Sequence, residues 1–204
     1  FQEAKDRGII HLLPTQGIKG HRNDSHSSNT NCPTVEQVKA LVDSTIGSDI
    51  MSVRDRAMLY CLAGLGLRRD EVSKITVGDF AQTQGRDVLI VHGKGSKERI
   101  VAIPERVLAA VRPLLGRISE QKTTPVFQEI DFNAKTFTGK AVSGSGIYYI
   151  IKRRMQAVGL EGCSPHSLRH FFITEARRNG CDLHKVQLAA GHADPRTTER
   201  YDRS

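Results

Sequence analysis

The sequence has 204 residues, of which 38% are hydrophobic and 25% are charged, a composition typical of globular domains and unlike that of a disordered chain. Thirty Lys and Arg against 22 Asp and Glu give a net charge of +8, which favours an anionic partner such as nucleic acid. No apolar run approaches the ~18 residues of a membrane span, and no signal peptide is recognisable, so a membrane partner is not expected.

Residues 1–33 differ in composition from the rest of the chain. Residues 1–13 are expected to be the tail of a helix from an upstream domain, because the chain begins with Phe1 rather than Met, as a fragment or processed product would. Residues 14–33 contain Gly, Ser, Asn, Thr, His and basic residues but almost no apolar ones. This predicts a flexible basic interdomain linker, although a disordered chain end would have the same composition. The main domain is predicted over 34–204.

The first helix of this domain is predicted to begin after Thr34, with Gln37 completing a capping box. The almost wholly apolar stretch 57–67, with glycines near its end, predicts a buried central helix, and a polar helix is predicted over 68–75. Strands are predicted over 87–91 and 99–103, joined as a hairpin by the turn 93–96.

The remaining elements are mostly helical. Pro104 is expected to start a helix that ends near Leu115, where Pro113 interrupts it. Residues 119–146 are poorly periodic and are predicted to be loop with little regular structure. Further helices are predicted over 148–158, over 166–178 after Ser164 and Pro165, over 183–190 before Gly191, and from Asp194 and Pro195 through Tyr201. The fold class is therefore mainly α with a small antiparallel β-sheet (α+β).

A basic cluster is predicted on the helix over 166–178. His166, Arg169 and His170 stand at i, i+3 and i+4, so they share one helix face. A guanidinium presents a bidentate fork to two phosphate oxygens, and a nearby histidine can assist it. A surface helix with one basic turn would have the same pattern.

Arg68 is predicted at a helix amino terminus, where free N–H groups favour a bound phosphate. Glu71 lies one turn further on and can hold the guanidinium in place. An ordinary solvated ion pair at i, i+3 is the simpler local interpretation.

Lys94 lies in the predicted hairpin turn, from which a lysine can reach into a site and donate a proton. Gly93-Lys94-Gly95 is not a phosphate-binding Walker loop, because it lacks the upstream glycine and a Ser or Thr directly after the lysine. Lys97 and Arg99 are predicted to contact a phosphate backbone or to be plain surface charges. Tyr201 has polar neighbours within one turn, which favours a reactive phenol, although its ordinary pKa of ~10 requires a base or positive charge nearby.

In chain order, G-L-R-x-x-E, G-K-G-x-K-x-R, H-x-L-R-H, G-H and T-T-x-x-Y resemble the motifs of the tyrosine recombinases, or phage integrase family, including its Xer-type and integron members. The resemblance spans Arg68 to Tyr201. It implies the fold of the catalytic domain of that family over 34–204 and a site-specific recombinase that breaks and rejoins DNA.

The resemblance also implies a role for each residue. Tyr201 would attack the scissile phosphate and form a 3′-phosphotyrosyl link, Arg68 and Arg169 would bind the non-bridging oxygens, and His192 would add a hydrogen bond. Lys94 would protonate the leaving 5′-oxygen, and His166 would assist proton transfer at the tyrosine. Glu71 would support Arg68, and His170 would be structural. No metal or other cofactor is implied, because fixed cations stabilise the charge.

The implied partner is a double-stranded DNA recombination site, bound by a homotetramer in the synaptic complex, in the bacterial cytoplasm with the nucleoid. Because the chain stops at Ser204, soon after Tyr201, we expect this fragment to be monomeric, to retain DNA cleavage with weak binding, and to lack subunit exchange.

Three alternatives remain open. Cys163-x-x-His166 and Cys181-x-x-His184 could form a tetrahedral zinc site in a DNA-binding module; otherwise the four scattered cysteines are predicted to be free thiols in a reducing compartment. A catalytically idle DNA-binding protein would retain the same motifs. A type IB topoisomerase uses similar residues, but the spacing from His192 to Tyr201 favours a recombinase.

Overall fold

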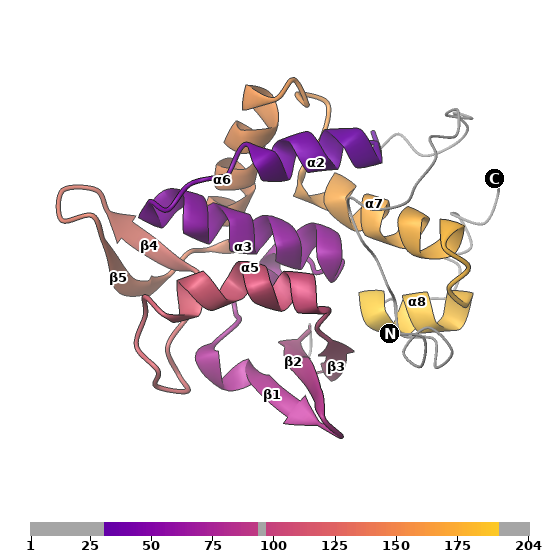
Figure 1. Cartoon of the computed structure of the whole chain (residues 1–204), viewed down its shortest axis with the longest axis horizontal. Helices are drawn as coiled ribbons and strands as arrows, with labels where there is room; N and C mark the ends of the chain where they lie inside the picture. Colours follow the sequence, from indigo (N-terminus) through magenta and orange to yellow (C-terminus); the bar gives the residue numbers. More distant parts are fainter. Residues whose placement is uncertain (1–30, 94–96, 192–204) are drawn as a thin grey trace.

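The computed structural model describes residues 31–93 and 97–191. Helix α3 (Ile50–Gly64) runs through the middle, between α2 (Val35–Asp43) and α5 (Glu105–Leu115) (Figure 1). The three-stranded sheet lies below α5 in this view. Helices α7 (Pro165–Arg178) and α8 (Leu183–Ala190) pack at one end of the molecule, on the right. Among the described residues, no helix is long and apolar enough to cross a membrane. The fold is mainly α with small antiparallel sheets, as predicted.

Helix starts follow the local capping residues. Thr34 caps α2 and exchanges two hydrogen bonds with Gln37, at 3.2 and 2.8 Å, which confirms the capping box. Helix α3 begins at Ile50 and not near Ala57, because the Asp49 carboxylate accepts hydrogen bonds from the first N–H groups of the helix. The polar helix predicted over 68–75 is shorter in the structure, where α4 spans Arg69–Val72.

The main sheet has three antiparallel strands in the order β1-β2-β3. Strands β2 (Arg86–His92) and β3 (Glu98–Ala102) form the predicted hairpin, with Leu89 opposite Val101. Strand β1 (Phe80–Thr83), after the short 3₁₀ helix η1 (Val77–Asp79), was not predicted. It is only four residues long and partly exposed, so it carries little hydrophobic alternation.

The prediction of a loop over 119–146 is wrong in part. Strands β4 (Gln128–Asp131) and β5 (Thr136–Ala141) form a second hairpin, in which the Asp131 carboxylate accepts hydrogen bonds from the turn. The signal is weak because β5 is mostly exposed. Helix α6 (Gly144–Ala157) begins earlier than predicted because Ser143 caps it through the N–H of Gly146.

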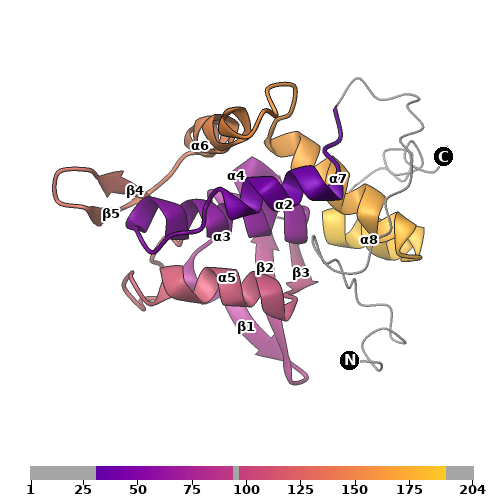
Figure 2. The ribbon, with the colours of Figure 1, turned by 45° about the horizontal axis from the view of Figure 1, so that its top comes forward.

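The carboxyl-terminal helices agree with the prediction. Helix α7 starts after Ser164, and α8 starts at the Asp182 cap and ends at Gly191, which has a left-handed φ of +65°. Figure 2 shows α7 and α8 together at one end of the molecule. A small apolar cluster joins the two helices, formed by Phe172, Ile173, Ala176, Val186 and Ala190. The helix predicted from Asp194 lies outside the described residues.

One buried ion cluster joins α3 to α6. Asp55 is fully buried and accepts hydrogen bonds from Arg54 at 3.0 and 3.1 Å and from Arg154 of α6 at 2.9 Å. This cluster lies on the wall of α3 that faces α6, and its role is to hold the two helices together.

Candidate active site

Arg68 lies at the junction between α3 and α4. The chain reverses at Gly66, whose φ of +63° suits glycine, and Arg68 then occupies the N-cap of α4. The backbone N–H of Arg68 donates to Oε2 of Glu71 at 2.8 Å, and its Nη1 donates to Oε1 at 2.9 Å. Because the Glu71 side chain is only 5% exposed, this contact is not the solvated ion pair that the local sequence favoured.

Glu71 is shared with Arg99 of β3. Nη1 and Nη2 of Arg99 donate to the two carboxylate oxygens at 2.8 and 2.9 Å, the bidentate geometry that makes such pairs strong. Burial alone raises the pKa of the Glu71 carboxyl, but the hydrogen bonds from Arg99 and the Arg68 backbone, with both positive charges, outweigh burial and lower it. Glu71 therefore stays ionised at neutral pH between two guanidinium groups.

The carboxyl end of α8 completes this network. Nε of Arg99 donates to the carbonyl of Ala189 at 3.0 Å, while Nη1 and Nη2 of Arg68 donate to the carbonyls of Ala190 and Gly191 at 3.4 and 2.9 Å. The last carbonyls of a helix lack intrahelical partners and carry partial negative charge, so they favour cations. Elements β3, α4 and α8 therefore meet at two arginines.

Helix α7 brings a third arginine to the same place. Arg169 is 1% exposed, and its Nη1 donates to the carbonyl of Gly66 at 2.6 Å. The His166 and His170 rings are 4.7 Å apart between centroids and nearly perpendicular, at 77°. The cluster predicted on one face of this helix is therefore present, and it adjoins the turn that carries Arg68.

Both histidines of α7 have a pKa below the ordinary value. Partial burial of the ring, followed by the positive charges of Arg169 and Arg68, lowers the pKa of His166. Burial, with His166 and Arg169, lowers the pKa of His170 to about 4. Both rings are therefore neutral at pH 7, and His166, which is exposed while His170 is buried, is the one able to take a proton from a ligand.

His92 of β2 contacts both η1 and β3. Its Nε2 lies 2.7 Å from Oδ1 of Asp79, and its Nδ1 lies 3.0 Å from Oε1 of Glu98. The hydrogen bond to Asp79, with the charges of both carboxylates, outweighs burial and raises the pKa of His92.

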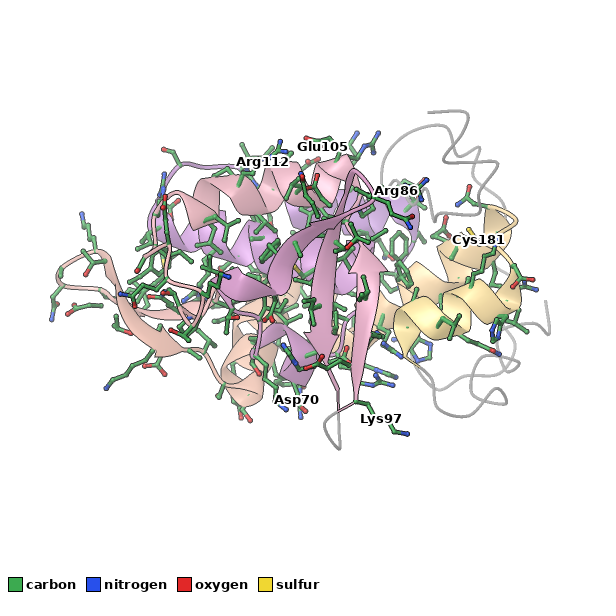
Figure 3. The ribbon with its side chains drawn as sticks, turned by 90° about the horizontal axis from the view of Figure 1, so that it is seen from below. Asp70, Arg86, Lys97, Glu105, Arg112 and Cys181 are labelled. Carbon is green, nitrogen blue, oxygen red and sulfur yellow. The ribbon has the colours of Figure 1, made fainter. Side chains whose placement is uncertain are left out.

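The end of this hairpin lies on the α4 side of the molecule. The N–H of Gly93 donates to the carbonyl of Lys97 at 2.7 Å. Lys97 is exposed, and in Figure 3 it projects on the same side as Asp70 of α4, away from Arg86. Lys94, His192 and Tyr201 lie outside the described residues, so their roles stay predictions.

Arg99 is not the plain surface charge that its sequence allowed, whereas its contact with a phosphate backbone stays a prediction. All three of its guanidinium nitrogens donate within the protein, and its side chain is 17% exposed. Strand alternation carried the missed signal, since Arg99 stands two residues before buried Val101, while Ile100 between them is 65% exposed.

Nothing in the described ranges supports the zinc alternative. No three His, Cys, Asp or Glu side chains there gather as metal ligands would. All four cysteines, which belong to the described residues, are free, as predicted. Burial raises the pKa of Cys163 and Cys181, which disfavours the thiolate that zinc binds.

Comparison with known proteins connects this site to a family. The family model described as "Phage integrase family" matches residues 33–204. The tyrosine recombinase XerD of Halalkalibacterium halodurans is 36% identical over 171 residues, covering 82% of this chain and 55% of that protein. XerD of Listeria innocua is 33% identical over 206 aligned positions, covering 97% and 68%. The chain thus spans about half to two thirds of the length of these relatives.

Solved structures share the fold. The crystal structure of XerA recombinase superposes with a TM-score of 0.70 at 26% identity, covering 91% of this chain and 62% of that one. XerH site-specific recombinase, bound to palindromic difH substrate in a post-cleavage complex, also gives 0.70, at 22% identity and with 91% and 53% coverage. With the family model matching most of its length, this chain belongs to the phage integrase family.

Proposed function

We propose that residues 34–204 form the catalytic domain of a site-specific tyrosine recombinase, and that 1–33 are the remnant of an upstream helix and an interdomain linker. One observation supports this proposal most. Arg169 of α7 donates to the carbonyl of Gly66, two residues before Arg68. The charges of both arginines act on His166 and help to keep its ring neutral. Two fixed cations and a proton acceptor are what transfer of a phosphodiester requires.

The proposed reaction needs no external energy source. The phenol oxygen of Tyr201 attacks phosphorus and passes its proton to His166, while the bond from phosphorus to the 5′-oxygen breaks. Lys94 protonates that oxygen, which leaves as a hydroxyl group. The phosphotyrosine keeps the energy of the broken bond, so attack by a 5′-hydroxyl of another strand rejoins DNA and releases the tyrosine.

Charge stabilisation in this proposal comes from the protein itself. Arg68, Arg169 and His192 would bind the non-bridging oxygens and stabilise the charge of the pentacoordinate transition state. Glu71 would hold Arg68, His170 would support His166, and Lys97 would contact the DNA backbone. These fixed positive groups supply the electrostatics that a metal ion supplies in other phosphoryl transferases.

The proposed partner is a double-stranded recombination site in the bacterial cytoplasm, within the nucleoid. The net charge of +8 and the DNA complex of XerH support a DNA partner. Recombination would require a homotetramer on DNA, whereas this chain alone is expected to be a monomer.

The test begins with selection of a DNA site from a pool of duplexes with a randomised centre. A nicked duplex carrying that site, incubated with the chain in EDTA, should give a covalent protein–DNA adduct that Tyr201→Phe abolishes. An adduct that requires metal, or that survives Tyr201→Phe, would refute this mechanism. Specific binding without any adduct would instead support the catalytically idle alternative.

A further inference from the structure

We infer that Arg99 is a positioning residue of the proposed active site. Arg99 holds Glu71 and the end of α8, so that Glu71 does not bind both terminal nitrogens of the Arg68 guanidinium and Arg68 can still reach a phosphate. The inference rests on the proposed function, because the phosphate contact of Arg68 is part of it. Arg99 thereby gains a function other than the DNA contact or surface charge that the sequence suggested for it.

The contact between Arg99 and Glu71 determines what Arg68 can reach. Arg99 presents two nitrogens to the two carboxylate oxygens, so it occupies one whole edge of the carboxylate. Arg68 donates only Nη1 from its side chain, to Oε1, while Oε2 takes its backbone N–H. Nη2 of Arg68 makes no bond to Glu71 and donates instead to the carbonyl of Gly191 at 2.9 Å, and the Arg68 side chain remains 44% exposed.

Without Arg99, the Glu71 carboxylate would face Arg68 alone. A buried carboxylate with one remaining cation gains most from a bidentate pair, because both oxygens are then hydrogen-bonded. Arg68 would turn toward Glu71 and withdraw Nη2 from its present place beside the carbonyl of Gly191. Arg99 thus prevents Glu71 from competing with phosphate for Arg68.

Arg99 also connects two segments that lead to proposed catalytic residues. Through Nε it holds the carbonyl of Ala189 in α8, one residue before the end of the helix that precedes His192. Gly191 packs against its guanidinium, since an added Cβ there would lie 2.7 Å from Nη1 of Arg99. Strand β3, which carries Arg99, is an arm of the hairpin that carries Lys94.

The geometry requires arginine and not a generic cation. Three nitrogens in one plane reach two carboxylate oxygens and one carbonyl at 2.8–3.0 Å. A lysine ammonium is a point charge on a flexible stem and cannot match this fixed fork. Arg99→Lys should therefore keep the positive charge but no longer hold Glu71 and the Ala189 carbonyl in place.

The experiment measures DNA affinity and adduct formation separately, with the selected nicked duplex as probe. Arg99→Gln and Arg99→Lys should form the adduct about 10–100-fold more slowly at saturating duplex, with dissociation constants within about threefold of the parent, since misplacement of about 1 Å costs ~10²-fold in rate. Arg86→Gln, an exposed arginine at the opposite end of the sheet, is the matched control and should change neither quantity (Figure 3).

The opposite pattern would overturn the inference. If Arg99→Gln weakens binding, reduces the salt dependence by about one phosphate contact and leaves the saturated rate unchanged, Arg99 contacts DNA. A normal rate in Arg99→Lys would show that its charge alone suffices. Arg99→Lys also covers the case in which Arg99→Gln does not fold.

A titration by NMR separates this inference from the proposed function. The pKa of Glu71 should rise in Arg99→Gln, whether or not the chain acts on DNA, because Arg99 donates two hydrogen bonds to that carboxylate. An unchanged pKa refutes the positioning contact even if the parent forms its adduct. A risen pKa with no adduct from the parent refutes the proposed function instead.

Discussion

Replacing Glu71 with glutamine removes the negative charge that Arg68 and Arg99 share but preserves the size of the side chain. The carboxylate accepts four hydrogen bonds, one from the Arg68 backbone, one from the Arg68 side chain and two from Arg99. The amide has one oxygen with which to accept them, and its NH₂ group faces another donor. We expect loss of both stability and catalytic rate.

The pair with Arg99 dominates the expected loss of stability. Both side chains are largely buried, at 17% and 5% exposed, and breaking a buried pair by removing one partner costs about 3–5 kcal/mol. Arg68 is 44% exposed, so its ion pair is screened by water and adds at most about 1 kcal/mol. Since glutamine retains part of the hydrogen bonding, we expect a net loss of about 3 kcal/mol, or about 6–12 °C in Tm.

Urea unfolding across pH tests this value and its cause. The pKa of Glu71 is lower in the folded than in the unfolded state, so its stabilisation is present above the unfolded pKa and is lost as pH falls through the folded one. The difference between parent and Glu71→Gln should therefore close in acid. Asp70→Asn makes the same charge change at the neighbouring, 71% exposed position and should cost little. A loss below about 1 kcal/mol at pH 7, or one independent of pH, would refute the reasoning.

Three further predictions concern the supporting structure. Asp55→Asn leaves Arg54 and Arg154 without their carboxylate between α3 and α6, and should destabilise the chain by about 3–5 kcal/mol in urea unfolding. A loss under about 1 kcal/mol would contradict the buried cluster. Gly66→Ala places a methyl group on a residue with left-handed backbone and pushes it into the Phe172 ring. The melting temperature should therefore fall by several degrees, and adduct formation should slow. An unchanged melting temperature would rule out this close packing. His92 has a raised folded pKa, so its stabilisation is complete below the unfolded pKa and is lost as pH rises through the folded one. His92→Gln should therefore differ from the parent near pH 5 and converge with it in alkali, and a constant difference in unfolding free energy across that range would show that its ionisation has no effect.

The helices that carry the site could be predicted because their ends have strong local signals. The start of α7 is marked by Ser164 and Pro165. The start of α8 is marked by the Asp182 cap and its end by the left-handed Gly191. Such signals depend on neighbouring residues only. The position of His166, Arg169 and His170 on one face then follows from helical periodicity.

Contacts between distant segments could not be predicted in the same way. The bonds from Arg99 to Glu71 and to Ala189 join residues 28 and 90 positions apart, and no local pattern determines such pairings. The β4–β5 hairpin was missed for a different reason, since its second strand is mostly exposed and lacks hydrophobic alternation. Burial of Arg99 could still have been inferred from its place in β3.

Main-chain carbonyls hold much of the arginine cluster in place, namely those of Gly66, Ala189, Ala190 and Gly191. Every amino acid supplies a carbonyl, so replacing the alanine side chains leaves the acceptors themselves intact. A change in chain length, by contrast, would move these carbonyls. One residue added between Asn179 and Asp182 would have to be absorbed in that short connection, or α8 would turn by about 100° and carry its last carbonyls away from Arg68 and Arg99. We therefore expect side-chain changes at Ala189 to be tolerated better than insertions or deletions in this part of the protein.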